Sequence, residues 1–502
     1  MAEQIISPGV FQNENAPIVL AAAAAPLGAA IVGPTVKGQI GIPTVVSTYS
    51  EYLQKFGGSF VSGGFEQTYF TALSAQNYFR QGGTSLTVVR VASGSANFTA
   101  GDSTTIANDR PNVLATTISI ASITTNVTGG TAATYTAVAI VGGTGSGGVV
   151  TVILDSATNI SSIAVTTAGT GYIIGDTVTI AATDLGAGST EVGLTLVADD
   201  LLLSSSFSLK TISQGANQNS FSTMAAGQAL PSGSSANIRF EVSNVNTSSG
   251  IFDLFVRQGN DRMADKTILE SWRGVSLDAT RDDFISKVIG NQQFTIGTEG
   301  SDSFVNITGE YPNKSNYIIV SGIASPTPNY LNGAGNPEPA LTGSLPIAQS
   351  GSFKSAVGDL IFNGGTGVTN MYDTISNTNS QGLIADDYTS SINLLKNKDQ
   401  YAFNVISTPG LIYAFATHKT VLDSLIANTT TRGDSILPID VSAYGATVAS
   451  TVSEASSLNT NYAAAYWPWL LVNDQNTGAN VWAPASTIIP SVYVYNDTQS
   501  RA

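Results

Sequence analysis

Residues 29–58 read AAIVGPTVKGQIGIPTVVSTYSEYLQKFGG. The run of small and branched apolar residues at its start predicts a buried strand that ends at Gly33-Pro34. Residues 42–58 predict a short strand and then a helix, with Ser50 as a plausible N-cap and Gly57-Gly58 as its end. Two strands and a helix in so short a stretch are typical of an α/β domain.

The neighbouring residues extend this pattern. Residues 66–83, EQTYFTALSAQNYFRQGG, place apolar side chains at helical spacing, and residues 84–92, TSLTVVRVA, predict a strand. Residues 21–95 therefore predict the first half of an α/β core. Residues 341–502 predict the second half, with the helical stripe Tyr388, Ile392 and Leu395, a helix over about 415–427, and buried strands within 401–410 and 434–441.

The intervening chain has a different character. Residues 96–205 are rich in Ser, Thr, Gly, Val and Ile and show short alternating strands with glycine turns, which predicts an inserted all-β domain. Residues 206–340 predict a second inserted domain, of α+β type. The expected fold class is a multidomain α+β protein, with a discontinuous α/β core formed by the N- and C-terminal parts and inserted β-rich domains.

Residues 1–20 predict an extended N-terminal arm. Ile5, Ile6, Val10 and Phe11 are apolar but flank the turn residues Ser7-Pro8-Gly9, so they are too few to fold alone. A segment of this kind either frays or adds a strand to the edge of another sheet.

Composition excludes several classes of function. Only 11% of the residues are charged and the formal net charge is −15, whereas an ordinary soluble domain has about 25% charged residues. An acidic chain lacks the basic face that nucleic acids and anionic membranes require. The absence of cysteine excludes disulfides and thiolate sites. A weakly charged surface suits a protein packed against copies of itself, and equally a secreted or viral β-rich protein.

The apolar residues 17–33 predict neither a signal peptide nor a membrane span. No basic residue precedes Lys37, and Pro17, Pro26 and Pro34 interrupt the run.

The sequence contains no convincing catalytic, cofactor or metal constellation, and we expect no enzyme. Gly143, Gly145 and Gly148 match GxGxxG, but a strand-like run follows them, which favours a hairpin turn. The single histidine, His418, lies on a packed helical stripe and is expected to be partly buried or at an interface.

Several acidic residues have structural explanations. Asp386-Asp387 is expected to cap a helix, Asp176 to cap a turn, and Asp199-Asp200 to lie in a solvated turn. The RGD tripeptide at residues 432–434 carries almost no weight, because three-residue matches are common by chance.

Three of the four tryptophans lie within residues 466–484, YWPWLLVNDQNTGANVWAP. The pattern predicts a buried strand with Trp467 and Trp469 on one face, a turn, and Trp482 on the next strand. Three buried tryptophans could lock the two halves of the core together. An aromatic patch that stacks on a ligand is the alternative interpretation.

The sequence resembles the tail sheath proteins of contractile-tailed phages and related contractile injection systems. The resemblance runs in order along nearly the whole chain. It rests on SPGV (7–10), residues 29–58, YFRQGGTSLTVVRV (78–91), TTAGTGYIIGDTVTI (166–180), FDLFVRQGNDR (252–262), WRGVSLDATRDDFISKVIG (272–290) and NYAAAYWPWLLVNDQNTGANVWAPAS (461–486).

The resemblance implies a structural subunit without a cofactor. Copies would form stacked hexameric rings around a tail tube protein and contract on a baseplate signal to drive the tube through the host envelope. Other partners would be baseplate and tail terminator proteins, with no nucleic acid and no membrane insertion. The protein would belong to the virion tail and assemble in the host cytoplasm.

One feature departs from the family. Its members continue with a W-x-x-P-A-G-like sequence and a C-terminal domain with a second arm, whereas this chain ends at NDTQSRA. The expectation is a truncated chain, or one completed by a second polypeptide, which would not form a sheath alone. The alternative function is a β-rich secreted adhesin or surface-layer protein, and a hydrolase is a distant third.

Overall fold

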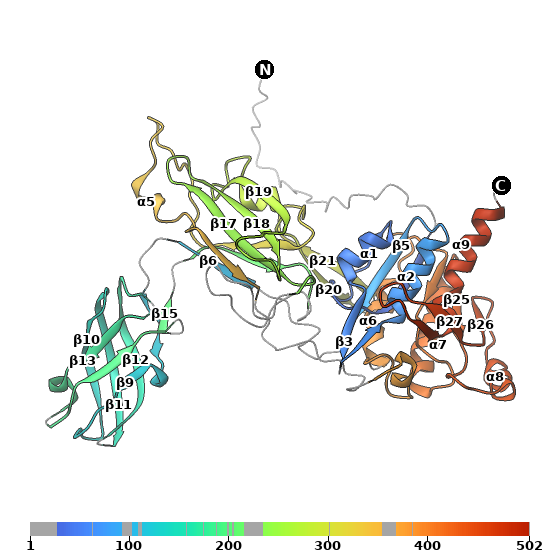
Figure 1. Ribbon diagram of the computed structural model, residues 1–502, viewed down its shortest axis with the longest axis horizontal. Coiled ribbons are helices and arrows are strands. Elements are labelled where there is room, and N and C mark those ends of the chain that lie inside the picture. Colours follow the sequence, from blue (N-terminus) through green and yellow to red (C-terminus); the bar gives the residue numbers. More distant parts are fainter. Residues whose placement is uncertain are drawn as a thin grey trace, which may run out of the picture.

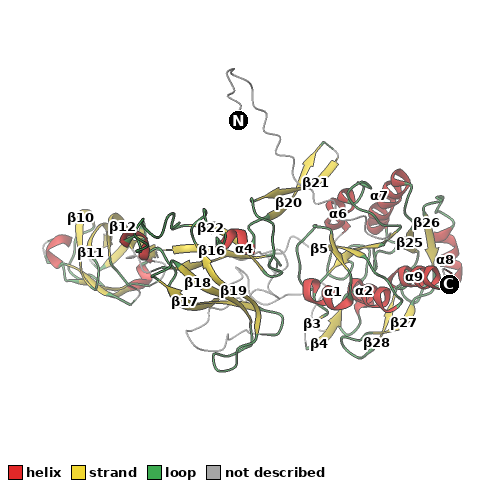
Figure 2. Cartoon of the chain, turned by 90° about the horizontal axis from the view of Figure 1, so that it is seen from above, coloured by secondary structure: helices red, strands yellow, loops and turns green. Residues whose placement is uncertain are grey.

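The computed structural model describes residues 28–500, apart from 63, 93–102, 109–112, 157, 174, 187, 198–199, 203–204, 215–233, 301, 354–367 and 384 (Figure 1). The chain is an α+β protein with several separate sheets, as the sequence predicts. It forms an α/β body that carries the C-terminus, a middle β body and an outer β body, which are seen side by side along the molecule (Figures 1 and 2).

The α/β body is built on a sheet that joins distant parts of the chain. Its strand order is β2-β5-β1-β24. The central strand β1 (Ala29–Pro34) runs parallel to β5 (Leu86–Val91) on one side and to β24 (Val405–Ser407) on the other. The first and last parts of the chain therefore share one sheet, and β2 (Thr44–Val46) lies antiparallel to β5 at the far edge.

The sheet continues beyond β24 through a single bridge. Val405 pairs with Ile436, which leads directly into β25 (Leu437–Asp440), and β25 runs parallel to β26 (Ala463–Tyr466). These strands bring their carboxyl ends to the same side of the α/β body.

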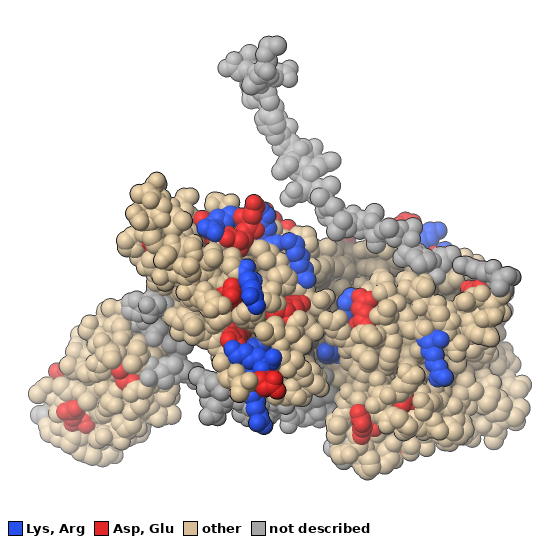
Figure 3. Space-filling view, turned by 45° about the horizontal axis from the view of Figure 1, so that its top comes forward, with Lys and Arg blue, Asp and Glu red and all other residues tan. Residues whose placement is uncertain are grey.

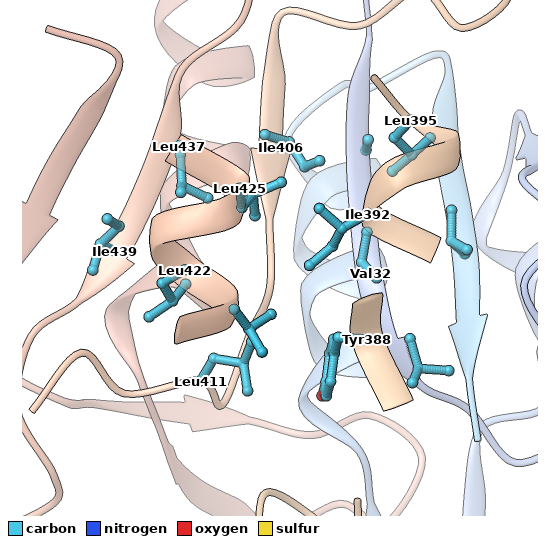
Figure 4. Packing of buried hydrophobic residues seen from close by; sticks show 14 of the residues in the cluster. Val32, Tyr388, Ile392, Leu395, Ile406, Leu411, Leu422, Leu425, Leu437 and Ile439 are labelled. Carbon is cyan, nitrogen blue, oxygen red and sulfur yellow. The ribbon is translucent and has the colours of Figure 1, made fainter. Parts of the chain in front are cut away.

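Helices cover both faces of this sheet. Alternate residues of a strand point to opposite sides, so β1 packs against helices on each face. Ala30 and Val32 of β1 pack on the side of Tyr388, Ile392 and the apolar stripe of α7 (Figure 4). Ala29 and Ile31 pack on the other side, in the cluster that contains residues of α1 and α2. A strand buried on both faces explains the continuous apolar run that the sequence shows.

Helices α1, α2, α6 and α7 of this body agree with predicted ones, with shifted ends, whereas α8 and α9 were not predicted. Thr48, and not Ser50, caps the first helix, because its side chain accepts a hydrogen bond from the N–H of Glu51. The helices are α1 (Tyr49–Phe56), α2 (Phe70–Arg80), α6 (Thr389–Leu394), α7 (Ala416–Arg432), α8 (Val448–Ala455) and α9 (Ile489–Ser500), with short 3₁₀ turns η4 (Met371–Thr374), η5 (Ala385–Tyr388) and η6 (Ala485–Thr487).

Two hairpins complete the α/β body. They are β3 (Ser59–Ser62) with β4 (Phe65–Thr68), and β27 (Leu470–Asn473) with β28 (Asn480–Ala483). Both contribute to one apolar cluster, in which Phe60 and Phe70 from the first part of the chain pack with Trp469 and Ala483 from the last.

The middle body consists of two sheets with a shared core. One sheet has the order β19-β18-β17-β23 and the other β22-β16-β6. The alternating residues Ile238, Phe240 and Val242 of β17, which pairs with β18, lie in this core. The elements are β6 (Ser103–Ala107), β16 (Ser205–Thr211), β17 (Ile238–Asn246), β18 (Ile251–Gln258), β19 (Ile268–Ser276), α4 (Ile285–Ile289), β22 (Ile318–Ile323), α5 (Pro339–Thr342) and β23 (Gln349–Ser352).

The outer body is a seven-stranded antiparallel sheet with the order β8-β12-β11-β10-β13-β14-β9 and a core of its own. Its elements are β7 (Val113–Leu114), β8 (Thr117–Ile118), η1 (Ile120–Ser122), β9 (Ile123–Thr125), β10 (Ala133–Gly142), β11 (Ser146–Ser156), β12 (Asn159–Thr170), β13 (Thr177–Ile180), η2 (Ala182–Leu185), β14 (Val192–Thr195) and β15 (Leu201–Leu202).

The two β bodies are nested and do not follow one another along the chain. β6 pairs with β16 across the whole outer body, so residues 113–202 form an insertion within the middle body. β23, at residues 349–352, pairs with β17 and also belongs to the middle body. Strand β6 belongs to the middle body, although the sequence predicts it within the inserted all-β domain 96–205. Strand β23 also belongs to the middle body, although the sequence predicts it within the second half of the core, 341–502.

Several hydrogen bonds and an ion pair join the middle body to the α/β body. The buried Arg90 guanidinium donates to the carbonyl oxygen of Gly38 at 2.6 Å and to that of Gln214 at 2.9 Å. The hairpin of β20 (Gln293–Glu299) and β21 (Asp302–Thr308) lies against α6, where Lys396 is 3.7 Å from Asp302.

Candidate assembly surface

The sheet of the α/β body ends on an open strand. In the described part of the chain, β26 pairs with β25 alone. An edge strand presents unpaired N–H and C=O groups that can accept a further strand. The side chains of Ala463, Ala464 and Ala465 are small, so they leave the backbone of this edge accessible.

The ladder defines which backbone groups of β26 point outward. Leu437 pairs with Ala463, and its N–H donates to the carbonyl oxygen of Tyr462 at 2.9 Å. Because hydrogen-bonding groups alternate along a strand, the N–H and C=O of Ala464 face β25. The N–H and C=O of Ala463 and Ala465 therefore point toward the open edge.

Exposed apolar side chains lie at the same end of the molecule. Val448 and Val452, one turn apart on α8, are 61% and 62% exposed, and Val492 and Tyr495 on α9 are also exposed. Figures 1 and 2 both place α8, α9 and β26 at this end. The hydroxyls of Tyr466 and Tyr493, 2.5 Å apart, join β26 to α9.

Charge is unevenly distributed over the surface. On the face seen in Figure 3, Lys, Arg, Asp and Glu gather on the middle body, whereas most of the α/β body is uncharged. An apolar, weakly charged surface beside an open strand is typical of a protein–protein interface.

The predicted arm residues Ile5, Ile6, Val10 and Phe11 lie outside the described residues. Their proposed role between subunits therefore stays a prediction.

The three tryptophans are not buried together. Trp469 is buried, and its Nε1–H donates to the carbonyl oxygen of Ser442 at 3.0 Å. It contacts Phe70 of α2 at a ring distance of 6.0 Å, so it joins the two parts of the core. The prediction of burial is wrong for Trp467 and Trp482, which are 41% and 37% exposed. Trp467 lies between β26 and β27, and Trp482 lies on β28, where its ring is 5.6 Å from that of Tyr444.

Gly143 and Gly145 lie in the hairpin turn between β10 and β11, as expected, and Gly148 lies at the start of β11. A Cβ atom at Gly145 would lie 2.3 Å from the ring of Tyr172, and the N–H of Gly148 donates to the Tyr172 hydroxyl at 3.1 Å. The Tyr172 side chain leaves no room for a Cβ atom at Gly145 or Gly148, which explains why both positions are glycine.

His418 is fully buried on α7. Its Nδ1 accepts the N–H of Ile412 at 3.2 Å, and Phe415 contacts its ring edge-on. Burial lowers the pKa of His418 to about 4, against a smaller opposing effect from the backbone of Asn379. A neutral imidazole is therefore part of the core packing.

The RGD tripeptide ends a helix. Gly433 is the left-handed C-cap of α7, with φ of 73°. The buried Arg432 donates to the carbonyl oxygens of Leu395 at 2.7 Å and Tyr401 at 2.9 Å, and its Nε lies 3.0 Å from Asp434. This arginine is not available for adhesion.

The acidic residues have different roles. Asp176 accepts the backbone N–H groups of Thr144 and Ile173, each at 3.0 Å, as its predicted capping role requires. Asp200 is fully buried, accepting from the N–H of Ser119 at 2.6 Å, so the expected solvated turn is wrong there, and Asp199 lies outside the described residues. Asp386 and Asp387 lie in η5, directly before α6.

Sequence reasoning missed a buried cluster of charges in the middle body. Arg257 contacts Asp261 at 2.8 Å and Glu241 at 2.6 Å, Arg239 pairs with the same Asp261, and Lys266 contacts Glu241 at 2.7 Å. The sequence contains a signal for this cluster, because the charged residues Arg239 and Glu241 alternate with the core residues of β17. We interpret the cluster as structural, because each carboxylate faces two cations.

The described residues contain no cluster of three or more His, Asp or Glu side chains that could hold a metal ion. Among the described helices, none is long and apolar enough to cross a membrane.

No family model and no curated protein matches the chain. Solved structures similar to it include two sheath tail proteins. One is the sheath tail protein of Desulfitobacterium hafniense, with 8% identity and a TM-score of 0.33 over 97% of this chain and 61% of that chain. The other is a sheath tail protein of Listeria innocua, with 9% identity and a TM-score of 0.36 over 94% and 56%.

The chain thus spans about three fifths of the length of these two proteins.

Proposed function

We propose that the chain is a structural subunit of a contractile tail sheath. The observation that carries the proposal is the open edge of β26, at the end of a sheet that already joins the first and last parts of the chain. The ordered sequence resemblance to sheath proteins supports the same function.

In this proposal, the arm of one subunit adds a strand to the β26 edge of a neighbour. The added strand would pair with the outward N–H and C=O groups of Ala463 and Ala465. The exposed apolar side chains of α8 and α9 would then be covered by the same neighbour, which fits the scarcity of charge at this end.

The assembled subunits would form stacked rings around a tail tube, held at their ends by baseplate and terminator proteins. Contraction would rotate each subunit as a rigid body while the shared strands keep neighbours connected. The driving free energy would reside in the contacts between subunits, and the chain would act in the virion tail after assembly in the host cytoplasm.

The alternative of a secreted adhesin gains no specific support. Its most suggestive feature, the RGD tripeptide, is a helix cap with a buried arginine.

The test is removal of residues 1–15, followed by assembly with the tube protein and negative-stain microscopy. We expect a folded protein with an unchanged melting temperature that no longer forms striated tubes. Replacing Ile5, Ile6, Val10 and Phe11 with serine should have the same effect. Replacing Gln4, Gln12 and Asn13 with serine is the matched control and should leave assembly intact. Normal tubes from the deleted protein would refute the proposal.

A further inference from the structure

An exposed loop of the middle body carries the dipeptide Asn332-Gly333. The loop connects β22 to α5 and projects from the body (Figure 1). Its base is fixed by the buried Tyr330 and by an antiparallel bridge between Leu331 and Pro337. Residues 332–336 are all exposed. Water therefore reaches the Asn332 side chain, although the loop has a defined conformation.

An asparagine followed by glycine can react with its own backbone. The nitrogen of the glycine attacks the side-chain Cγ, a C–N bond forms, and the side-chain amide leaves as ammonia. The resulting five-membered succinimide has two C–N bonds that water can open. Opening one gives aspartate, and opening the other gives isoaspartate, in which the main chain runs through the former side chain. The net reaction consumes one water and releases one ammonia, without an oxidant or reductant.

The attacking and leaving groups are both free in this loop. Within the described part of the chain, the N–H of Gly333 donates no hydrogen bond, whereas those of Ala334, Gly335 and Asn336 each donate one. The Nδ2 amide of Asn332 makes no hydrogen bond there either. A Cβ atom at Gly333 would meet no atom within 4 Å, so the attacking nitrogen is also sterically accessible.

The side-chain oxygen of Asn332, by contrast, is held by two donors. Oδ1 accepts the N–H of Ala334 at 3.0 Å and that of Asn336 at 3.1 Å. Negative charge develops on this oxygen when the nitrogen attacks Cγ. Backbone N–H groups at such distances stabilise that charge, as they do in an oxyanion hole. The loop therefore supplies electrostatic stabilisation to the step that forms the ring.

A second asparagine shows the opposite arrangement. Asn379 also precedes a small residue, Ser380, but the N–H of Ser380 donates to the carbonyl oxygen of Leu383 at 2.8 Å. Ser380 is buried as well. Because its nitrogen is engaged and shielded, the same reaction is blocked at Asn379.

We propose that Asn332 is a site of spontaneous deamidation in the folded protein. The reaction adds one negative charge to the loop. In the isoaspartate form it also lengthens the main chain by one carbon, which disrupts the 2.8 Å bond from the N–H of Asn332 to the carbonyl oxygen of Asn336. The inference does not depend on the sheath function, since it concerns the chemistry of one loop.

The experiment incubates the full chain near neutral pH and maps its peptides by mass spectrometry over time. Exchange of the amide for a hydroxyl raises the peptide mass, and chromatography separates the aspartate and isoaspartate products. Mapping also resolves Asn363, which precedes a glycine and lies outside the described residues. We expect progressive conversion of Asn332 in the folded protein, at a rate within about tenfold of the rate in urea, whereas Asn379 stays intact.

Gly333→Ala is the decisive variant. Its Cβ atom has room in the fold but crowds the attacking nitrogen, so conversion should slow at least about tenfold, or about 1.4 kcal/mol in activation free energy. Gly322→Ala is the matched control. Gly322 lies on β22 with equally open surroundings, outside the loop, and this variant should react as the original chain does.

Three results would overturn the proposal. The first is an intact Asn332 in the folded protein after the chain in urea has converted, which would show that the loop protects this residue. The second is undiminished conversion of Gly333→Ala. The third is conversion of Asn379 ahead of Asn332 in the folded protein.

Discussion

The carboxylate of Asp440 accepts a hydrogen bond of 2.8 Å from the backbone N–H of Ser486 and a second one from the Ser486 hydroxyl. These bonds attach the segment before α9 to the end of β25. Burial raises the pKa of Asp440 to about 7, although the hydrogen bonds from Ser486 and Ala485 oppose this effect.

The raised pKa of Asp440 predicts a pH-dependent stability. Between about pH 4 and pH 7 the folded protein retains a proton that the unfolded chain releases, so this group makes the protein less stable as pH rises. The loss is of the order of 4 kcal/mol, at about 1.4 kcal/mol per pKa unit. Denaturant titrations at several pH values measure the free energy of unfolding. Over this range it should fall more steeply with pH in the original chain than in Asp440→Asn. Parallel pH profiles would contradict the prediction.

His418 has the opposite effect. Its pKa is lowered to about 4 by burial, so between about pH 4 and pH 6.5 the unfolded chain binds a proton that the folded protein does not. Stability from this group rises with pH, by about 3 kcal/mol over the window. We expect His418→Gln to lose this rise, and urea unfolding at pH 4.5 and pH 7 measures the difference. If the variant retains the full rise, the assignment to His418 is wrong.

The buried charges of the middle body should be sensitive to the loss of one partner. Asp261→Ala leaves Arg239 and Arg257 buried without their shared carboxylate, and should lower the free energy of unfolding by about 3–5 kcal/mol. Asp282, whose contact with Lys287 is fully solvated, is the control, and Asp282→Ala should not change the unfolding midpoint. Equal midpoints for both variants would show that the cluster contributes little.

The α/β half of the fold could be predicted because its signals are local. Continuous apolar runs such as Ala29–Val32 predict strands buried on both faces, and the stripe of Tyr388, Ile392 and Leu395 predicts a packed helix. The sequence could not show that β6 pairs with β16, because the pairing joins residues about a hundred positions apart.

The candidate site was predicted less well for a similar reason. Trp467, Trp469 and Trp482 have the same side chain, and their burial depends on which surface the β27–β28 hairpin covers. The open edge of β26 is equally invisible in a run of alanines. It becomes evident only from the strand order.

Trp469 is the tryptophan that we expect to stabilise the core. Trp469→Ala removes a buried indole that packs against Phe70 and donates a hydrogen bond to the carbonyl oxygen of Ser442. It should lower the free energy of unfolding by about 3–5 kcal/mol. Trp482→Ala, at a partly exposed position, should change it by less than about 1.5 kcal/mol. Thermal melting of both variants measures the difference, and similar melting temperatures would argue against a special role of Trp469.

The orientation of β26 allows its edge and its ladder to be tested separately. Ala465→Pro removes an N–H that points to the open edge, whereas Ala464→Pro removes one that bonds to β25. Proline is tolerated on an edge strand where its missing N–H faces outward.

We therefore expect Ala465→Pro to fold with nearly the original melting temperature and to fail in tube assembly, because a neighbour's arm cannot complete its ladder. Ala464→Pro should lower the free energy of unfolding by about 1–3 kcal/mol, since it removes a ladder hydrogen bond within the subunit and leaves its acceptor unpaired. Melting curves and sedimentation of assembled particles distinguish the two outcomes. Normal assembly of Ala465→Pro would show that β26 does not receive the added strand, even if the chain is a sheath subunit.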